Sequence, residues 1–188
     1  RLFQTSLGVS VLLAFYGILQ ILGVLAVHQG STRIDASLGN STYFAIYVVI
    51  HIFLALFLFL RHQENRFLQI TYGAIALLQL FILYHTATRG AILGFIGGVL
   101  LATLIIAIFE REEKRLRKIA IGTVVSIFAF IALFVAFKDS SFIQNTPNLA
   151  RFATVSLTDA YTNPRIPIWG LAIQGFKERP ILGWGQEN

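Results

Sequence analysis

The stretch AILGFIGGVLLATLIIAIF, residues 91–109, contains no charged side chain and is apolar nearly throughout. A bilayer core about 30 Å thick needs roughly 20 apolar residues in a helix. Backbone groups in lipid have no water to bind, so a stretch of this kind must be helical. Residues 91–109 therefore predict a membrane-spanning helix, and this decides the fold class.

Four other stretches have the same character, at about 7–27, 43–60, 67–84 and 119–137. The composition agrees, since 56% of the residues are hydrophobic and only 13% are charged, whereas a soluble domain has about 25% charged residues. We expect an all-α fold, a polytopic transmembrane helix bundle of about five spans within residues 1–137. Residues 138–188 contain all four prolines and are expected to form an outward-facing loop.

The basic residues are distributed unevenly between the two sides of this expected bundle. Alternating spans place eight of them on one side and only Arg33 and Arg89 in the short connectors of the other. Positive residues collect in cytoplasmic loops, so the connectors at 28–42 and 85–90 should face outward. Topology then explains the net charge of +6, and no nucleic acid partner is expected. The eight are Arg1, Arg61, Arg66, Arg111, Lys114, Arg115, Arg117 and Lys118.

The two outward arginines stand beside expected helix starts. Asn40 precedes the second span, and Thr88, Arg89 and Gly90 precede the fourth. A helix N-terminus presents unpaired N–H groups and favours anions, so these segments predict phosphate-type binding. Ordinary N-capping explains the Asn and Thr residues equally well, and an arginine that contacts lipid headgroups is the alternative for Arg33 and Arg89.

The outward tail contains one candidate amphipathic helix, from Arg165 to about Lys177. Its apolar face is typical of a helix that lies in the membrane interface. Arg165 and Trp169 are one turn apart, so they should be adjacent, and an aromatic interface anchor is the alternative interpretation. The residues of the apolar face are Ile166, Trp169, Ile173 and Phe176.

Other kinds of chemistry have little support. The chain has no Cys, and its four His residues show no metal-ligand spacing, so neither a metal nor a cofactor is expected. His51 falls within a span, where a buried hydrogen bond is its expected role, and His85 near Arg89 is a candidate for acid–base work. Gly90, Gly94 and Gly98 form a small-residue stripe that predicts close helix packing.

Four short motifs occur in order along the chain: residues 33–40, the Thr88–Ala91 tetrapeptide, Arg165 with Trp169, and residues 180–188. Together they resemble the O-antigen ligase and polymerase superfamily of bacterial envelope glycosyltransferases. The chain lacks Met and stops abruptly at Asn188, so we expect it to be part of a longer protein.

The resemblance implies a multi-spanning enzyme of the bacterial plasma (inner) membrane that acts in polysaccharide or lipopolysaccharide biosynthesis. It takes a glycan from undecaprenyl diphosphate and transfers it, on the outer face, to a hydroxyl of a glycolipid, glycan or protein. Membrane lipids are its other partners. A repeat-unit polymerase and a non-catalytic polyprenyl-phosphate-binding or transport module are the alternatives.

The resemblance also implies roles for particular residues. Arg89 and Arg165 match the arginines that hold the lipid diphosphate, and Arg33 is expected to join them. The general base of the family is a histidine that is commonly followed by asparagine. No histidine of this chain stands in that context, so the catalytic residue is expected beyond Asn188 and this part alone should be inactive. The supporting residues are Asn40, Thr88, Gly90 and Trp169.

Overall fold

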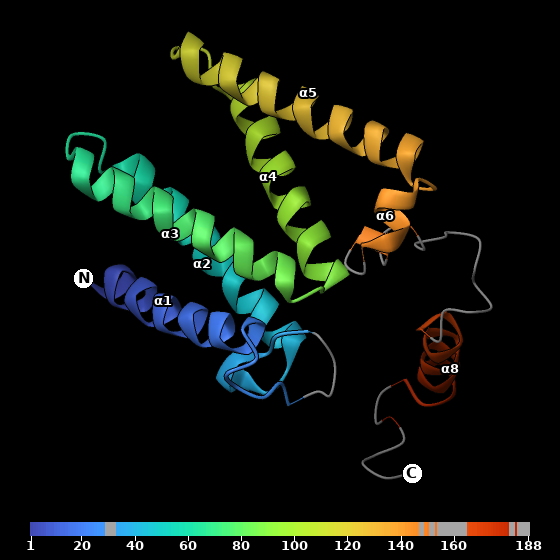
Figure 1. Cartoon of the computed structure of the whole chain (residues 1–188). Helices are drawn as coiled ribbons and strands as arrows, with labels where there is room; N and C mark the ends of the chain where they lie inside the picture. The colour runs from blue at the N-terminus through green and yellow to red at the C-terminus, as the bar shows by residue number, and fades with distance from the viewer. Residues whose placement is uncertain (29–32, 147–148, 151–152, 154–164, 181–182, 184–188) are drawn as a thin grey trace. The chain divides into compact units, whose positions relative to one another are not determined.

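The computed structural model describes residues 1–28, 33–146, 149–150, 153, 165–180 and 183, and the side chains of residues 165 and 166 lie outside this description. The chain forms two compact units, residues 1–153 and 154–188. Five helices are long and apolar enough to cross a membrane (Figure 1). The described residues contain no strand, and the predicted all-α fold with about five spans is confirmed.

Among the elements whose bounds the structure describes, the first unit contains the five long helices and two short ones. The second unit contains one described helix, where the sequence predicted an amphipathic helix. The helices are α1 (Leu2–Ile21), η1 (Ala36–Leu38), α2 (Ser41–Arg61), α3 (Arg66–His85), α4 (Arg89–Phe109), α5 (Lys114–Phe137), α6 (Ser141–Asn145) and α8 (Arg165–Glu178).

The first helix ends earlier than its hydropathy predicts. The apolar stretch runs to residue 27, but α1 stops at Ile21 because Gly23 adopts a left-handed conformation with φ +73°. The N–H of Gly23 donates to the Gln20 carbonyl, and the N–H of Val24 donates to the Leu19 carbonyl. This pair of bonds is a Schellman motif. The apolar residues that follow belong to the connector to α2.

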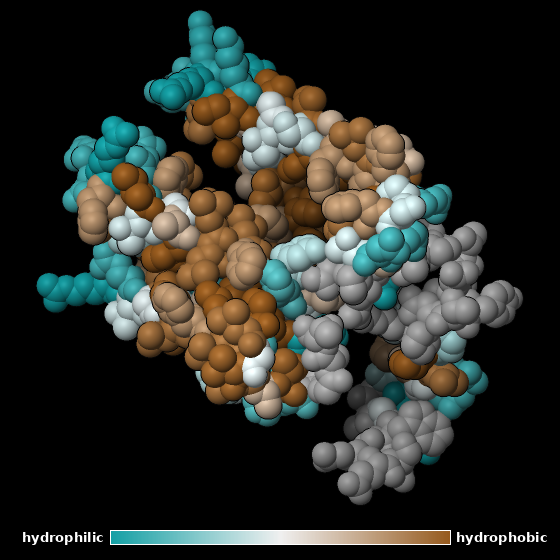
Figure 2. Space-filling model, viewed as in Figure 1, coloured by the Kyte–Doolittle hydropathy of each residue, from teal (hydrophilic) through white to brown (hydrophobic). Residues whose placement is uncertain are grey.

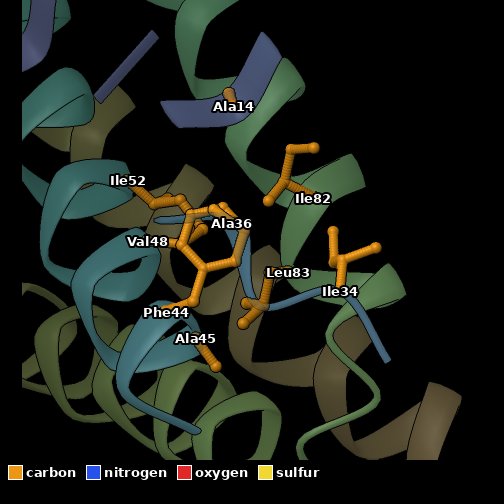
Figure 3. Close-up of a cluster of buried hydrophobic side chains, with 9 residues drawn as sticks. All are labelled: Ala14, Ile34, Ala36, Phe44, Ala45, Val48, Ile52, Ile82 and Leu83. Atoms are coloured by element: carbon orange, nitrogen blue, oxygen red, sulfur yellow. The ribbon is translucent and has the colours of Figure 1, made fainter. Parts of the chain in front are cut away.

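The core of the first unit lies between α1, α2 and α3 (Figure 3). It includes a piece of connector as well as helix faces, because Ile34 and Ala36 are buried among the helical side chains. Gly17 of α1 makes room for this insertion, since a Cβ there would lie 3.3 Å from Ile34 Cδ1. The α1–α2 connector is therefore fixed at one end of the bundle by apolar packing. The buried members of the cluster are Ala14, Ile34, Ala36, Phe44, Ala45, Val48, Ile52, Ile82 and Leu83.

Polar side chains inside the spans join α1 to its neighbours. Ser6 bonds with His51 Nε2 of α2 at 2.9 Å, and Gln79 of α3 donates to Ser10 at 3.0 Å. His51 Nδ1 also donates to the Tyr47 carbonyl at 2.7 Å, which confirms the predicted buried hydrogen bond. Such bonds hold helices together in a membrane, where the hydrophobic effect does not.

The fourth and fifth helices pack on each other and leave most of their apolar surface exposed (Figure 2). The glycine stripe of α4 is only partly used for packing. A Cβ at Gly98 would lie 2.8 Å from Phe53 Cζ of α2, whereas Gly90 and Gly94 have nothing within 4 Å. Only Gly98 therefore provides the close helix approach that the stripe predicted.

Candidate functional site

One end of the bundle contains the outward arginines of the sequence prediction. There α1 and α3 finish while α2 and α4 begin, since consecutive helices run in opposite directions. We call this the Arg89 end. The α1–α2 connector and the three-residue turn 86–88 meet at this end, and each contains a non-glycine residue in the left-handed region, Ala36 (φ 48°) and Ala87 (φ 47°).

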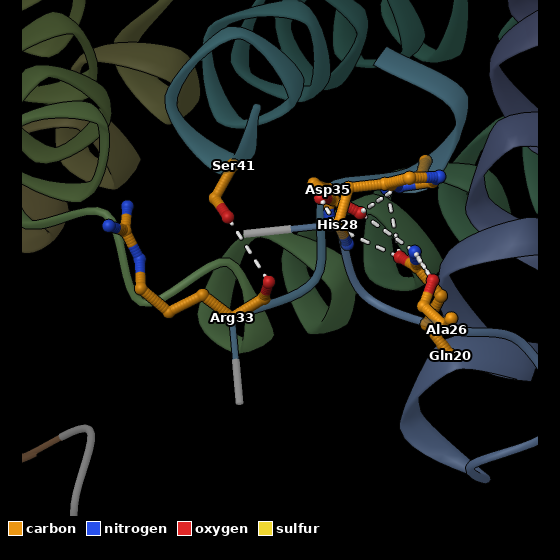
Figure 4. Close-up of polar contacts among 7 residues, drawn as sticks. Gln20, Ala26, His28, Arg33, Asp35 and Ser41 are labelled. Atoms are coloured by element: carbon orange, nitrogen blue, oxygen red, sulfur yellow. Dashed lines mark hydrogen bonds and ion pairs between the residues drawn. The ribbon is translucent and has the colours of Figure 1, made fainter. Parts of the chain in front are cut away.

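A buried amide–carboxylate cluster fixes the α1–α2 connector to the end of α1 (Figure 4). Gln20 Nε2 donates to Asp35 Oδ1 at 2.7 Å, and Gln20 Oε1 accepts from the N–H groups of Asp35 and Ala36 at 3.1 and 2.9 Å. Gln20 Nε2 also donates to the Ala26 carbonyl at 2.9 Å. The His28 N–H donates to Asp35 Oδ2 at 3.0 Å. The carboxylate is fully buried, so these bonds replace its lost hydration.

These contacts shift the ionisation of Asp35. Burial alone would raise the pKa of its carboxyl, but the hydrogen bonds from Gln20 and His28 and the charge of His28 lower it. The net pKa of Asp35 lies below its ordinary value of 3.8. The folded protein therefore holds this carboxyl ionised more firmly than the unfolded chain does.

The stability of the connector should depend on pH for this reason. The Asp35 contribution is present above 3.8, the ordinary pKa, and is lost as the pH falls through the lower folded value, because the unfolded state then binds more protons. Thermal unfolding from about pH 6 to about pH 3 should show a loss of stability that Asp35→Asn reduces. Equal pH dependence in the two proteins would contradict this assignment.

Arg33 reaches from the connector to the α3–α4 turn. Its Nε donates to the Thr86 carbonyl at 3.1 Å and its Nη2 to Thr88 Oγ1 at 2.9 Å. The Ser41 hydroxyl donates to the Arg33 carbonyl at 3.1 Å, and the Arg33 side chain extends away from the Gln20–Asp35 cluster (Figure 4). The structure thus brings Arg33 and Thr88 into contact, as residues of two connectors that are far apart in the sequence.

The two helix N-termini at this end differ. At α2, Asn40 Oδ1 accepts from the N–H groups of Thr42 and Tyr43 at 2.8 and 3.3 Å, so Asn40 is an N-cap. At α4, Thr88 is the N-cap residue but its side chain makes no capping bond. The first bond within α4 is from Ile92 N to the Thr88 carbonyl, which leaves the N–H groups of residues 89–91 without a helical partner.

Arg89 is the first residue of α4 and is partly exposed. None of the described residues forms a hydrogen bond or ion pair with its guanidinium. Gly90 follows, and the space beside it is open, since a Cβ there would meet nothing within 4 Å. A guanidinium, three N–H groups and the positive end of a helix dipole thus stand together in a position suited to an anion.

The second unit, described by itself, contains α8, which begins at Arg165 as the sequence predicted. The Arg165 side chain and the Ile166 side chain lie outside the described part, as does most of the 180–188 motif. On the described part of α8, Trp169, Ile173 and Phe176 are all exposed. No described residue of the second unit covers this apolar face.

Among the described residues, the histidines and acidic side chains form no second site. His85 Nδ1 donates to the Phe81 carbonyl of its own helix at 3.0 Å, and its ring packs against Phe81 and Tyr84. No described contact joins His85 to Arg89. Within the residues that the structure describes, no three His, Asp or Glu side chains gather as metal ligands would.

The sequence pattern did not reveal Gln20, whose side-chain amide forms hydrogen bonds with Ala26, Asp35 and Ala36 at the Arg89 end. The available signal was a single amide near the end of an apolar stretch, followed in the connector by an aspartate. Such an amide is expensive to bury without partners. It therefore predicts a partner, although not which one.

Comparison with known families adds one finding. The sequence model of a family described as O-Antigen ligase matches residues 74–188, more than half of the chain. The match includes Thr88, Arg89, Gly90, Arg165 and Trp169, and it begins after Arg33 and Asn40. No curated protein and no solved structure matches the chain.

Proposed function

Since the chain belongs to the O-antigen ligase family, a family of membrane glycosyltransferases, we propose that its gene product uses undecaprenyl diphosphate as glycan donor. The acceptor in this proposal is a hydroxyl of a glycolipid, glycan or protein, and the reaction takes place at the outer face of a bacterial plasma membrane. The Arg89 end is the outer end in this orientation, because the opposite end contains most of the basic residues.

The observation on which the proposal rests is the position of Arg89. It lies inside the matched region, at the first position of α4, beside N–H groups that no side chain caps. Guanidinium groups bind phosphate through paired, charge-assisted hydrogen bonds. Helix N-termini bind phosphate through backbone N–H groups and the helix dipole. Both features at one place favour a diphosphate over a neutral ligand.

The chemistry explains why such a site would accelerate transfer. When the acceptor hydroxyl oxygen attacks the sugar carbon, its proton passes to a general base, which we expect beyond Asn188. The bond from that carbon to the diphosphate oxygen breaks, and negative charge develops on the leaving group. Fixed donors aimed at developing charge lower the barrier, because they need no reorganisation during the reaction. Arg89 and the α4 N-terminus would provide such donors.

The remaining residues of the proposed site have supporting roles. Arg165 would provide a second guanidinium from the start of α8, and Trp169 would hold that helix at the membrane interface with its exposed apolar face. Gly90 gives a phosphate access to the backbone. Asn40 caps α2, and Thr88 shapes the turn that presents Arg89.

The proposal is tested by reconstituting the full-length gene product in nanodiscs with a glycan on undecaprenyl diphosphate. We expect glycan transfer in step with release of undecaprenyl diphosphate, and tighter binding of that lipid than of undecaprenyl phosphate. Saturable binding without turnover would overturn the proposal in favour of a lipid-binding or transport module. Elongation of a repeat-unit chain would assign the acceptor to a polymerase of the same superfamily.

A further inference from the structure

Arg33 has two hydrogen bonds to the turn that precedes Arg89. Its Nε and Nη2 donate to the Thr86 carbonyl and to Thr88 Oγ1, at 3.1 and 2.9 Å. These two acceptors flank Ala87, which is buried and has a φ of 47°. A non-glycine residue in the left-handed region persists only where its surroundings impose it. The Arg33 guanidinium holds both sides of this strained residue.

The same contact determines what Thr88 can do. Its hydroxyl accepts from Arg33 and lies 3.3 and 3.2 Å from the Ser41 and Thr86 carbonyls, to which it donates. A threonine at an N-cap position normally accepts from the first N–H groups of its helix. With its oxygen turned toward Arg33, Thr88 does not cap α4. The N–H groups beside Arg89 stay available for a ligand as a result.

The backbone on either side of the Arg33 side chain is held in place by its own contacts. The next residue, Ile34, is 2% exposed in the core, and the Asp35 carboxylate is bound to Gln20. The Arg33 carbonyl accepts from the Ser41 hydroxyl at the start of α2. A chain of contacts thus links the end of α1 to the turn before α4 through one extended side chain.

We propose that Arg33 is a positioning residue of the donor site: it turns Thr88 away from the α4 N-terminus and so presents Arg89 and the uncapped N–H groups to the diphosphate. This inference rests on the proposed function. It replaces the direct phosphate contact that the sequence predicted for Arg33 with an indirect role through Thr88.

A double-mutant cycle on the full-length protein separates the two roles. Binding of undecaprenyl diphosphate is measured for Arg33→Gln, Thr88→Val and the double variant. We expect each single change to weaken binding about tenfold. The double variant should also lose about tenfold rather than hundredfold, because both changes break the same link. A loss of binding in the double variant equal to the product of the two single losses would overturn the proposal. No loss of binding in either single variant would overturn it as well.

Three further variants complete the experiment. Thr88→Ser keeps the hydroxyl and should bind like the wild type, and a loss equal to that of Thr88→Val would overturn the proposal. Arg117→Gln is the matched control, since Arg117 Nε also donates to a backbone carbonyl, that of Ala107, at the opposite end of the bundle. Arg89→Ala tests the proposed function separately. If this variant binds the lipid as tightly as the wild type, the proposed diphosphate site at Arg89 is wrong, whatever the result for Arg33.

Hydrogen exchange without lipid gives an independent readout. Arg33→Gln and Thr88→Val should both raise exchange across residues 86–92, because each loosens the turn. A residue that touches only the phosphate would leave the lipid-free exchange unchanged, and that result would overturn the proposal. If Arg33→Gln is not recovered folded, Arg33→Lys takes its place in the cycle, since a lysine lacks the fork that reaches both acceptors.

Discussion

Replacing Arg89 with Ala in the full-length protein should lower kcat/KM for glycan transfer by about 100- to 1,000-fold, the usual effect of removing one donor aimed at developing charge. The reason is the partly exposed position of Arg89 at the first residue of α4, beside N–H groups that no side chain caps. Transfer is measured with undecaprenyl-diphosphate-linked glycan, and insertion is checked by the yield of protein in the membrane.

The matched control is Arg66→Ala. Arg66 is also the first residue of a long helix, but it lies at the opposite end of the bundle, where Asn65 caps α3. Its loss should leave transfer unchanged. Arg89→Lys keeps the charge without the planar fork and should still lose at least about tenfold, because a hydrogen bond to a charged group is worth about 1.5–3 kcal/mol. Transfer at the wild-type rate in Arg89→Ala would refute the assignment of the site.

The fold class could be predicted from the sequence because the bilayer imposes a simple rule. Any long apolar stretch must be a helix, so five stretches gave five helices without knowledge of their contacts. The helix ends follow from local chemistry that hydropathy ignores. The end of α1 shows this, since Gly23 stops the helix although apolar residues continue beyond it.

The candidate site was only partly predictable. The hydroxyl and amide groups at the starts of α2 and α4 look equivalent as sequence, and both fit capping or anion binding. The structure distinguishes them because Asn40 bonds to its own helix while Thr88 bonds to Arg33, which is 55 residues away. A contact over that separation depends on how four helices pack, and no local pattern encodes it.

The burial of the Asp35 charge in the Gln20–Asp35 cluster could not be predicted from a local sequence pattern either. An aspartate in a polar connector predicts a solvated side chain, yet the Asp35 carboxylate is fully buried. Its partner is an amide 15 residues earlier, at the end of an apolar helix. The apolar insertion of Ile34 beside it explains why the carboxylate is drawn into the core.

Gln20→Leu should produce the largest loss of local stability at this end, about 3 kcal/mol, because a buried donor or acceptor without a partner costs about 1–3 kcal/mol. The change removes the amide donor of Asp35 and leaves the buried N–H groups of Asp35 and Ala36 without their acceptor. Hydrogen exchange of residues 33–41 should become about 100-fold faster, because local opening sets its rate.

Two further variants test this prediction: a control at another glutamine of α1, and a second substitution of Gln20 that keeps its acceptor oxygen. Gln4→Leu removes an exposed glutamine of the same helix whose Nε2 donates to the Tyr72 hydroxyl at 3.1 Å, and it should cost less than about 1 kcal/mol. Gln20→Glu keeps the acceptor for both N–H groups but sets a second carboxylate against Asp35, so its cost should grow as the pH rises and both groups ionise. Equal exchange in Gln4→Leu and Gln20→Leu would mean that the connector is held by the packing of Ile34 and Ala36 alone. Apolar packing alone would then hold the connector segment that contains Arg33, and glycan transfer should survive the loss of Gln20.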